Sequence, residues 1–287
     1  LRPVPEDSID AMVGIVDLVR RGARSRSEIG HATGLTRAVV SQRVAELLDR
    51  GLLAETVAPS TGGRPPKQLE LRSDSGHLLL ADIGATSIDV ALADASGGIV
   101  AQLDEPADVA VGPAIVLERV ERLFERLLAA NDPPGDLWGL GIGVPGPVEF
   151  RTGRPISPPI MPGWEGYPVR EHFNRRYHAP VWVDNDVNIM ALGEWRSGAA
   201  REHRNFIFVK VGTGIGSGIV SNGHIHRGAQ GSAGDIGHIR VLAETEAVCR
   251  CGKVGCLETL AGGAALARDG LTAAREGRST RLAASLQ

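Results

Sequence analysis

The protein has 287 residues and a formal net charge of −3, which excludes a uniformly basic nucleic-acid-binding protein. Two or three domains are expected at this length. The sequence contains no apolar run long enough to cross a membrane and no signal peptide, so we expect a soluble cytoplasmic protein without a membrane partner. Residues 20–72 carry ten Lys or Arg against five acids, and such a basic module on an acidic body is typical of a DNA-reading domain.

Three helices are predicted in the N-terminal region. The second of them, a short helix over 27–33, ends at Gly34. Thr36 is expected to cap the third, which runs from about Arg37 to Arg50. Two such helices and their turn form the helix-turn-helix unit, whose second helix enters the major groove. A three-helix bundle with a solvated polar face is the alternative. The first helix, over 8–19, has its apolar residues at Ile9, Met12, Val13, Val16, Leu18 and Val19.

Two short strands, at 52–56 and 68–71, follow the third helix, and the segment 60–67 between them is predicted to be the wing of a winged helix. Its Gly63-Arg64-Pro65 sequence resembles the motifs in which an arginine side chain enters a narrow minor groove of DNA. The wing favours DNA binding over a plain bundle. Arg24, Arg26 and Lys67 are expected to contact phosphates. The predicted DNA-binding residues are Arg37, Ser41, Gln42, Arg43, Arg64 and Lys67.

From residue 77 onward, buried strands end in polar turns. Strand 78–83 leads through Asp82-Ile-Gly84-Ala-Thr86 into a second strand at 87–94, a pattern found in the phosphate-facing turn of actin-like ATPases and sugar kinases. Gly84 would let backbone N–H groups approach a phosphate, Thr86 offers a hydroxyl, and Asp82 can hold a metal-bound water. A plain β-hairpin is the alternative. A strand at 99–103, a helix at 114–130 and a strand at 137–144 follow.

Two later strands also end in polar turns. Asp186 follows strand 181–183, at the edge where ligands bind in α/β sheets, and would be the general base in phosphoryl transfer to a sugar. Capping of the next helix by Asp184 or Asp186 is the alternative. After strand 206–211, the turn 212–218 is predicted to touch phosphates through Gly212, Thr213 and Gly214. It lacks the lysine of a Walker loop and the glycine spacing of a Rossmann loop.

All three cysteines lie between residues 249 and 256. An odd number of cysteines cannot all pair within one polypeptide, and a secreted disulfide framework would spread them along the sequence. Three thiols this close, with glycines between them, predict a metal. A structural zinc site takes four ligands, and His238 lies eleven residues upstream of the first cysteine. Three reduced thiols without a metal are the alternative.

Together these motifs resemble the ROK family of repressors, open reading frames and sugar kinases, from about Leu78 to Gly262. The N-terminal module and its wing look like the repressor branch, which regulates sugar catabolism or amino-sugar use. The motifs are Asp82-x-Gly84-x-Thr86, Asn185-Asp186, the turn 212–218, Gly237-His238 and Cys249-x-Cys251-Gly-x-x-Gly-Cys256-x-Glu258.

The resemblance implies an α/β fold with three parts. A winged helix-turn-helix at 1–75 would precede a ribonuclease-H-like (actin-like ATPase) body with subdomains at 76–190 and 191–287. Family members continue well past the cysteine motif, so we expect the second subdomain to be incomplete and the protein to be truncated at its C-terminus. The implied sugar-binding residues are Asn185, Asp186, Asp235, His238 and Glu258, and the implied ligands of a structural zinc are His238, Cys249, Cys251 and Cys256.

Two residues depart from the family pattern. Asp235 stands where sugar kinases usually have Glu, which shortens its reach by one methylene and puts one sugar contact in doubt. Ala85 stands where Gly is usual, which costs little if its φ is negative.

The resulting hypothesis is a sugar-responsive transcriptional repressor, a homodimer or homotetramer that binds operator DNA and a sugar or amino-sugar effector. The alternative is an ATP-dependent sugar kinase that uses ATP and Mg²⁺ with Asp186 as its base. A structural DNA-binding protein with a vestigial body is a third possibility.

Overall fold

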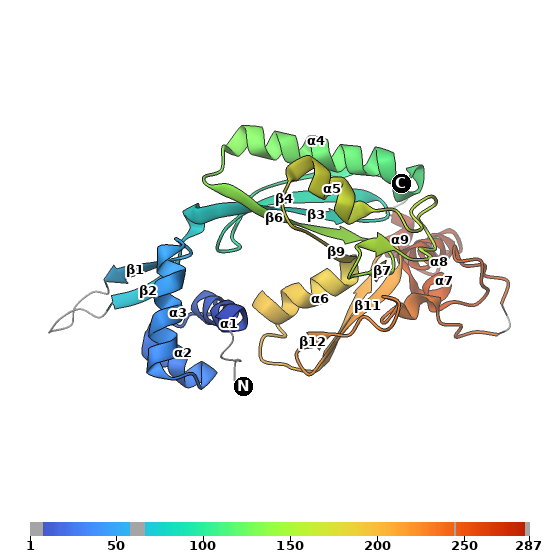
Figure 1. The fold of residues 1–287 in the computed structure, drawn as a ribbon. Helices are drawn as coiled ribbons and strands as arrows, with labels where there is room; N and C mark the ends of the chain where they lie inside the picture. The colour runs from blue at the N-terminus through green and yellow to red at the C-terminus, as the bar shows by residue number, and fades with distance from the viewer. Residues whose placement is uncertain (1–7, 58–66, 244, 285–287) are drawn as a thin grey trace. The chain divides into compact units, whose positions relative to one another are not determined.

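The computed structural model describes residues 8–57, 67–243 and 245–284, with backbone alone at 8–10 (Figure 1). The polypeptide divides into two compact units. One unit comprises Leu1–Leu79, Ala91–Gln102 and Glu125–Gly139, and the other comprises Leu80–Val90, Leu103–Phe124 and Leu140–Gln287. The expected domain boundaries near residues 75 and 190 stay predictions.

The first unit begins with the three predicted helices and the two predicted strands, which together form the N-terminal module. The two strands pair antiparallel, with Leu53 opposite Leu71. The elements are α1 (Ser8–Arg20), α2 (Arg26–Thr33), α3 (Arg37–Asp49), β1 (Leu53–Val57) and β2 (Lys67–Leu71).

Local capping residues set the ends of α2 and α3. Ser25 and Glu28 form a reciprocal capping box at the start of α2, which satisfies two backbone N–H groups that the helix leaves open. Gly34 ends α2 with a φ of +73°, a conformation that glycine adopts without strain. The Thr36 hydroxyl accepts the Val39 N–H at 3.3 Å, so the predicted cap of α3 is confirmed.

The module has its own apolar core, to which α1 contributes one face. Along α1 the buried positions are Ala11, Ile15 and Val19, which repeat every four residues on one face. Val13, one of the apolar residues noted in this helix, lies off that face and is 63% exposed. The other buried members are Ile29, Leu35, Val40, Val44, Leu47, Leu53 and Leu69.

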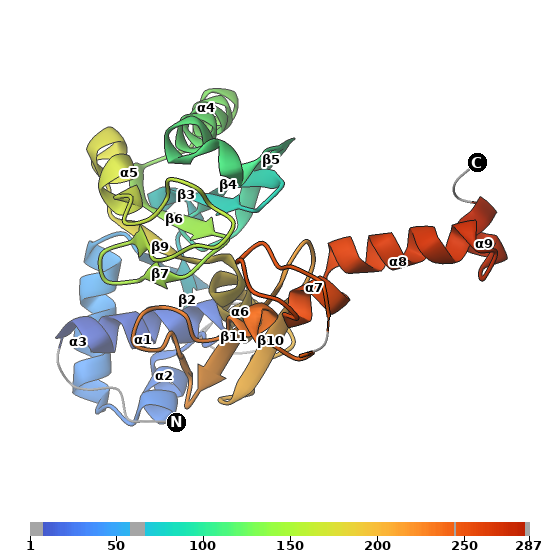
Figure 2. The same cartoon turned by 90° about the vertical axis from the view of Figure 1, so that its right-hand side faces the viewer.

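A five-stranded sheet follows in the order β5-β4-β3-β6-β9, and β6 runs parallel to β9. Two helices, α4 (Pro113–Asn131) and α5 (Val169–Tyr177), lie side by side on one face of this sheet (Figures 1 and 2). The fold is therefore mixed α/β around a central sheet. The strands are β3 (Gly76–Ile83), β4 (Ser87–Asp94), β5 (Ile99–Pro106), β6 (Asp136–Val144) and β9 (Val181–Asn185).

A smaller sheet lies in the second unit. Its strands β10 (Phe206–Val211), β11 (Ile215–Ser221) and β12 (His224–Ile225) are antiparallel, and α6 (Asp186–Ser197) packs against β10 and β11. A strand, β11, therefore follows the glycine-rich turn. The C-terminal helices are α7 (Leu257–Ala261), α8 (Gly263–Arg275) and α9 (Thr280–Ala284). Among the described residues, no helix is both long and apolar enough to cross a membrane.

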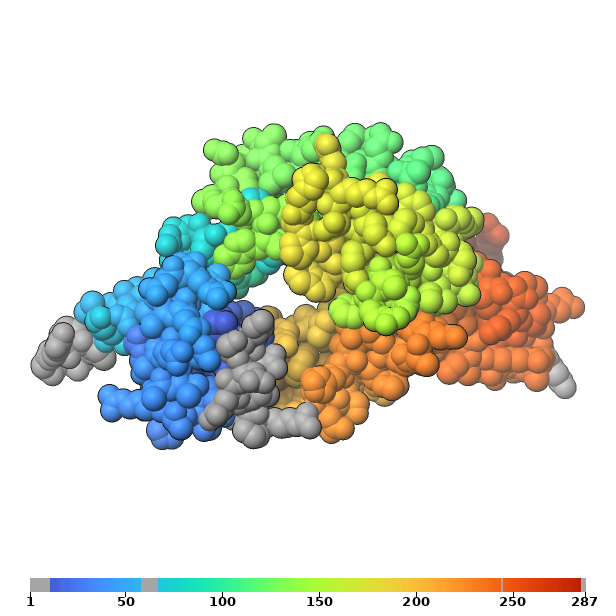
Figure 3. Space-filling view, viewed as in Figure 1, coloured from blue at the N-terminus to red at the C-terminus, as the bar shows by residue number. Residues whose placement is uncertain are grey.

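A short hairpin closes one side of this unit. Its strands are β7 (Val148–Glu149) and β8 (Arg154–Pro155). A Cβ atom at Gly231 would lie only 2.1 Å from the Val148 carbonyl oxygen, so the hairpin backbone touches the loop after β12. In Figure 3 the yellow-green segment lies directly against the orange one.

Contact between α6 and β11 leaves no room for a side chain at Gly218. A Cβ there would lie 2.5 Å from Ala191 Cβ, so Gly218→Ala is expected to destabilise the protein by about 1–3 kcal/mol through overpacking. Gly193 in α6 has open space around it, and Gly193→Ala is expected to stabilise by up to ~1 kcal/mol. Urea unfolding of both variants measures the difference, and equal effects would contradict the predicted packing.

Candidate functional site

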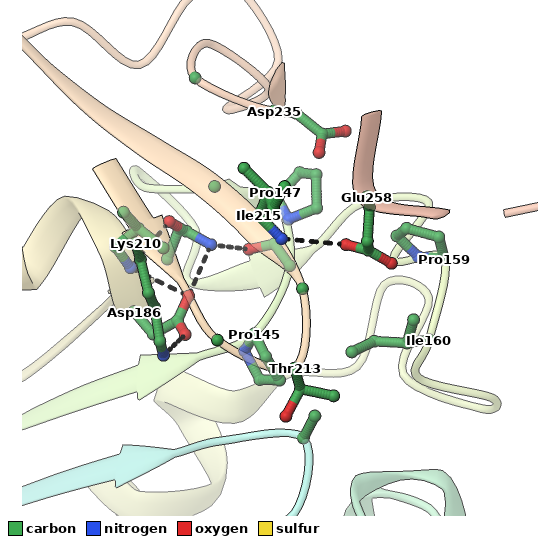
Figure 4. Close-up of a pocket in the computed structure, with 18 of the residues that line it drawn as sticks. Pro145, Pro147, Pro159, Ile160, Asp186, Lys210, Thr213, Ile215, Asp235 and Glu258 are labelled. Atoms are coloured by element: carbon green, nitrogen blue, oxygen red, sulfur yellow. Dashed lines mark hydrogen bonds and ion pairs between the residues drawn. The ribbon is translucent and has the colours of Figure 1, made fainter. Parts of the chain in front are cut away.

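The second unit contains a cavity of about 340 Å³, near the lower end of the size range of small-ligand sites. Both predicted phosphate turns border it, through Gly84 and Thr86 on one side and 212–214 on the other. All five predicted sugar-binding residues also line it. They are Asn185, Asp186, Asp235, His238 and Glu258, and Figure 4 shows three of them around the opening.

Helix α6 is capped by Asn185 and not by either neighbouring aspartate. The Asn185 Oδ1 atom accepts the N–H groups of Val187 at 3.0 Å and Asn188 at 3.2 Å. Its Nδ2 atom donates to the Gly146 carbonyl and to Asp186 Oδ1. Asn185 therefore holds the shape of this wall of the cavity, and one oxygen of Asp186 also accepts the Val187 N–H in the first turn of the helix.

Asp186 forms an ion pair with Lys210, a residue that the sequence motifs did not single out. The Lys210 Nζ atom donates to Asp186 Oδ2 at 2.9 Å, and the Asp186 side chain is 7% exposed (Figure 4). Lys210 alternates along β10 with the exposed residues Val209 and Val211, on the same face as Phe206 and Phe208. A lysine on the inward face of an apolar strand is the signal that could have revealed it.

Asp82 begins the first predicted phosphate turn, and one of its carboxylate oxygens receives no hydrogen bond. Its buried Oδ1 atom has no hydrogen-bond partner. Burial raises the pKa of Asp82 and the negative charge of Asp186 raises it further, while the charge of Lys210 opposes both. In the same turn Ala85 has no positive φ, so its Cβ imposes no backbone strain. The turn is therefore compatible with the approach of a phosphate.

Side-chain packing determines which residues the glycine-rich turn can contain. Glu258 accepts the Ile215 N–H at 3.1 Å, and a Cβ at Gly214 would lie 2.5 Å from Glu258 Oε2. Gly214 thus makes room for Glu258, whereas a Cβ at Gly212 would meet only the Lys210 side chain at 3.8 Å. The Gly212 N–H donates to the Gly214 carbonyl and the Gly212 carbonyl accepts the Gly263 N–H, so the turn is closed by its own hydrogen bonds, and Glu258 is held by the turn that it borders.

The three cysteines and His238 converge as a group that could hold a metal. Their ligand atoms all lie within 4.8 Å of one another. Cys249 Sγ lies 3.4 Å from His238 Nδ1, and Cys251 Sγ lies 3.7 Å from Cys256 Sγ. Tetrahedral zinc with bonds of about 2.3 Å to sulfur and about 2.0 Å to nitrogen requires separations of roughly 3.5–3.8 Å between its ligands. The donor atoms and their spacing therefore fit such an ion.

The pKa shifts of the three thiols also favour a bound metal ion. Burial raises the pKa of Cys249 to about 12 and also raises the pKa of Cys256. Burial acts in the same direction at Cys251, but hydrogen bonds from the Lys253 backbone and the other two thiols lower its pKa overall. Of the three thiols, Cys251 is therefore the one whose thiolate form the polypeptide favours most. A bound dication would stabilise all three as thiolates.

His238 borders both the metal-binding group and the cavity. Its Nδ1 atom faces Cys249, whereas its Nε2 atom lies 3.9 Å from Asp235 Oδ1, beyond hydrogen-bond distance. A ligand hydroxyl could bind at Nε2 while Nδ1 binds a metal, and each interaction would fix the ring for the other.

Arg227 is a second residue that the sequence motifs did not single out. It joins three segments near the cavity. Its guanidinium donates to Asp184 Oδ2 at 2.7 and 2.9 Å and stacks 3.8 Å from the centroid of the Phe150 ring. Asp184 is buried, and its Oδ1 atom accepts from Asn188. This cluster ties the loop that carries Asp235 to the end of β9 and to the β7–β8 hairpin.

The predicted DNA-binding residues differ in their surroundings within the N-terminal module. Arg37 and Gln42 are exposed on α3 and Ser41 is half-buried. Arg43 is paired with Glu46 at 2.8 Å, and Gln42 Nε2 also donates to Glu46 at 3.3 Å. Lys67 and Arg26 share Glu55, whose pKa is lowered by hydrogen bonds from both. Arg64 lies outside the described residues.

Comparison with known proteins gives three informative matches. A family model described as "ROK family" matches residues 79–283. A glucokinase of Halalkalibacterium halodurans is 39% identical over 203 residues, covering 70% of this protein and 61% of the glucokinase. A putative xylose repressor of a Caldicellulosiruptor species is 34% identical over 244 residues, covering 84% of this protein and 61% of the repressor.

One solved structure extends the comparison to the N-terminal module. A ROK family transcriptional regulator, a homologue of the Escherichia coli MLC protein, superposes with a TM-score of 0.75 at 25% identity. The match covers 94% of this protein and 68% of that regulator. The 287 residues span about three fifths of the length of the glucokinase and the xylose repressor that they match.

The raised pKa of Asp82 predicts a pH-dependent stability effect. The ionised carboxylate is disfavoured in the folded state, so Asp82→Asn should raise the free energy of unfolding at pH 7, by about 1–3 kcal/mol for a buried group without a partner. The gain should shrink as the pH falls through the folded pKa, because wild-type Asp82 is then protonated. Thermal unfolding between pH 4 and 8 measures this. Asp104→Asn, at an exposed site, is the control, and a constant gain at all pH values would refute the prediction.

Proposed function

The protein belongs to the ROK family, and from this premise we propose that it is a sugar-responsive transcriptional regulator, most simply a repressor. In this proposal the N-terminal module is a winged helix that binds operator DNA, and the cavity of the second unit binds a sugar or amino-sugar effector. A homodimer or homotetramer would match a two-fold-symmetric operator. The observation that carries the proposal is the presence of both parts in one polypeptide.

DNA binding is supported by the form and charge of the N-terminal module. Its α3 follows a short helix and a glycine-capped turn, the arrangement in which the second helix reads the major groove. Arg37 at the start of α3 is exposed and Thr36 fixes the helix end beside it. Similarity to the xylose repressor covers more of the sequence than the family model does and so reaches into this module.

Sugar binding is supported by the polar groups around the cavity. Carboxylates and an imidazole converge there from separate segments of the sequence, and such groups bind the hydroxyls of a sugar by hydrogen bonds. The bound effector would act on DNA affinity by favouring one arrangement of the protein over another. The relatives are described as a glucokinase and a putative xylose repressor, which suggests glucose and xylose as first probes.

We further propose that the metal is zinc and that it is structural. Three thiolates and one imidazole fill all four positions of a tetrahedral ion, which leaves no open position for a reacting water. Bound zinc would fix the relative positions of the His238 and Cys256 segments. Both segments border the cavity, through His238 itself and through Glu258, two residues after Cys256. The metal would thus hold two sugar-binding groups in place.

An ATP-dependent sugar kinase is the second candidate. Asp186 beside the cavity, the glycine-rich turn 212–214 in the cavity lining and the similarity to a glucokinase favour it. A coupled assay of ADP release with D-glucose, D-xylose and N-acetyl-D-glucosamine distinguishes the two candidates. Turnover that Asp186→Asn abolishes would support the kinase, and DNA binding without turnover would support the regulator.

DNA binding by the intact protein is expected to be strongly salt-sensitive, because phosphate contacts release counterions. Fluorescence anisotropy with fragments from upstream of its own gene, titrated at 50–200 mM KCl, measures this. Arg37→Ala should weaken specific binding by about 1–3 kcal/mol, whereas Arg122→Ala on α4, an exposed arginine in the body of the protein, should not. The proposal fails if the intact protein binds no fragment or if the two variants behave alike.

One zinc ion per protein molecule is expected on elemental analysis of the purified protein. Cys251→Ser should lower the zinc content well below one equivalent, because it removes one of four ligands, and it should reduce sugar affinity while leaving the N-terminal module folded. His226→Ala removes an exposed histidine outside the metal-binding group and should retain full zinc. Absence of zinc from the wild-type protein would contradict this part of the proposal.

A further inference from the structure

We propose that Lys210 prevents Asp186 from acting as a proton acceptor, so that the cavity binds a sugar without phosphorylating it. The inference rests on the proposed function and concerns the same site. It assigns to one residue the difference between a sugar sensor and a sugar kinase.

Asp186 already has hydrogen-bond donors at both of its carboxylate oxygens. Oδ1 accepts the Val187 N–H at 2.9 Å and Asn185 Nδ2 at 3.0 Å, and Oδ2 accepts Lys210 Nζ at 2.9 Å. A general base needs an oxygen directed at the hydroxyl whose proton it takes. With 7% of the Asp186 side chain exposed, water offers little competition for these bonds.

The fold itself directs Lys210 toward Asp186. Strand β10 alternates between exposed and half-buried residues, and this alternation sets Lys210 on the face that packs against α6. Gly216 lies opposite Lys210 in the β10–β11 pair, and a Cβ there would lie 3.0 Å from Val187 Cγ2. Glycine at this position lets β11 approach the first turn of α6, which begins at Asp186.

Proton transfer to Asp186 would also break its ion pair. In sugar phosphorylation, a sugar hydroxyl oxygen bonds to the γ-phosphorus of a nucleoside triphosphate while the bond from that phosphorus to the diphosphate breaks. The hydroxyl proton would pass to Asp186. Protonation of Asp186 would remove the carboxylate charge that Lys210 pairs with and leave an ammonium ion without its partner beside a buried acid. Lys210 therefore opposes the proton transfer, while Oδ2, which has one donor, can still accept a hydrogen bond from a sugar hydroxyl.

The test compares Lys210 variants of the full protein with ATP, Mg²⁺ and each of D-glucose, D-xylose and N-acetyl-D-glucosamine. Lys210→Met removes the charge, and Lys210→Gln removes it but keeps an N–H donor in case the methionine variant does not fold. Both should phosphorylate at least one sugar faster than wild type, on the order of 10²-fold, the usual contribution of a positioned base. Lys210→Arg keeps a cation beside Asp186 and should remain as inactive as wild type.

Two further measurements separate this effect from a general loosening of the site. The double variant Lys210→Met, Asp186→Asn should lose the gained turnover, because the base is then absent. Isothermal titration with each sugar and with AMPPNP should show binding by the wild-type protein and by both neutral variants.

The inference is overturned if the neutral variants stay inactive, if they turn over less than wild type, or if wild type is itself an active kinase. It is also overturned if wild type binds no nucleotide, because Lys210 would then have no reaction to suppress. The proposed function is judged separately, by DNA binding and its response to sugar, so the two can fail independently.

Discussion

Three consecutive polar residues at the junction of β9 and α6 hold the second unit together, each through a different partner. Asp184 binds Arg227 and thereby the loop after β12, Asn185 caps α6, and Asp186 binds Lys210 on β10. A strand end, a helix start, a loop and a second sheet are thus fixed within a few residues. These residues border or support the cavity, so its shape depends on the ion pairs at the junction remaining intact.

Elements with regular periodicity were predictable from the sequence. Apolar runs that end in polar turns identified the main strands, and Gly34 and Thr36 identified the end of α2 and the start of α3. Helix α5 was missed because only Val169 and Phe173 are buried along its nine residues, and it follows a stretch rich in proline and glycine. Periodicity alone selected no single face of α1, because most of its residues are apolar.

Residues of the candidate site were found where a short motif contained them and missed where only tertiary contact defines their role. Cys249, Cys251 and Cys256 are neighbours in sequence, and their convergence with His238 was predictable from spacing. Lys210 and Arg227 meet their carboxylate partners across 24 and 43 residues. Such pairs depend on strand register and on the course of a loop, and neither is encoded in the spacing of a motif.

The close contact between β11 and α6 restricts how this unit can respond to a ligand. At Gly218 the strand backbone lies directly against Ala191 and the Val187 carbonyl, with no side chain between them that could change rotamer and absorb a displacement. The strand and the helix must therefore move together as a rigid body. A displacement of β11 would therefore also move Ser197, at the end of α6 that is remote from the cavity.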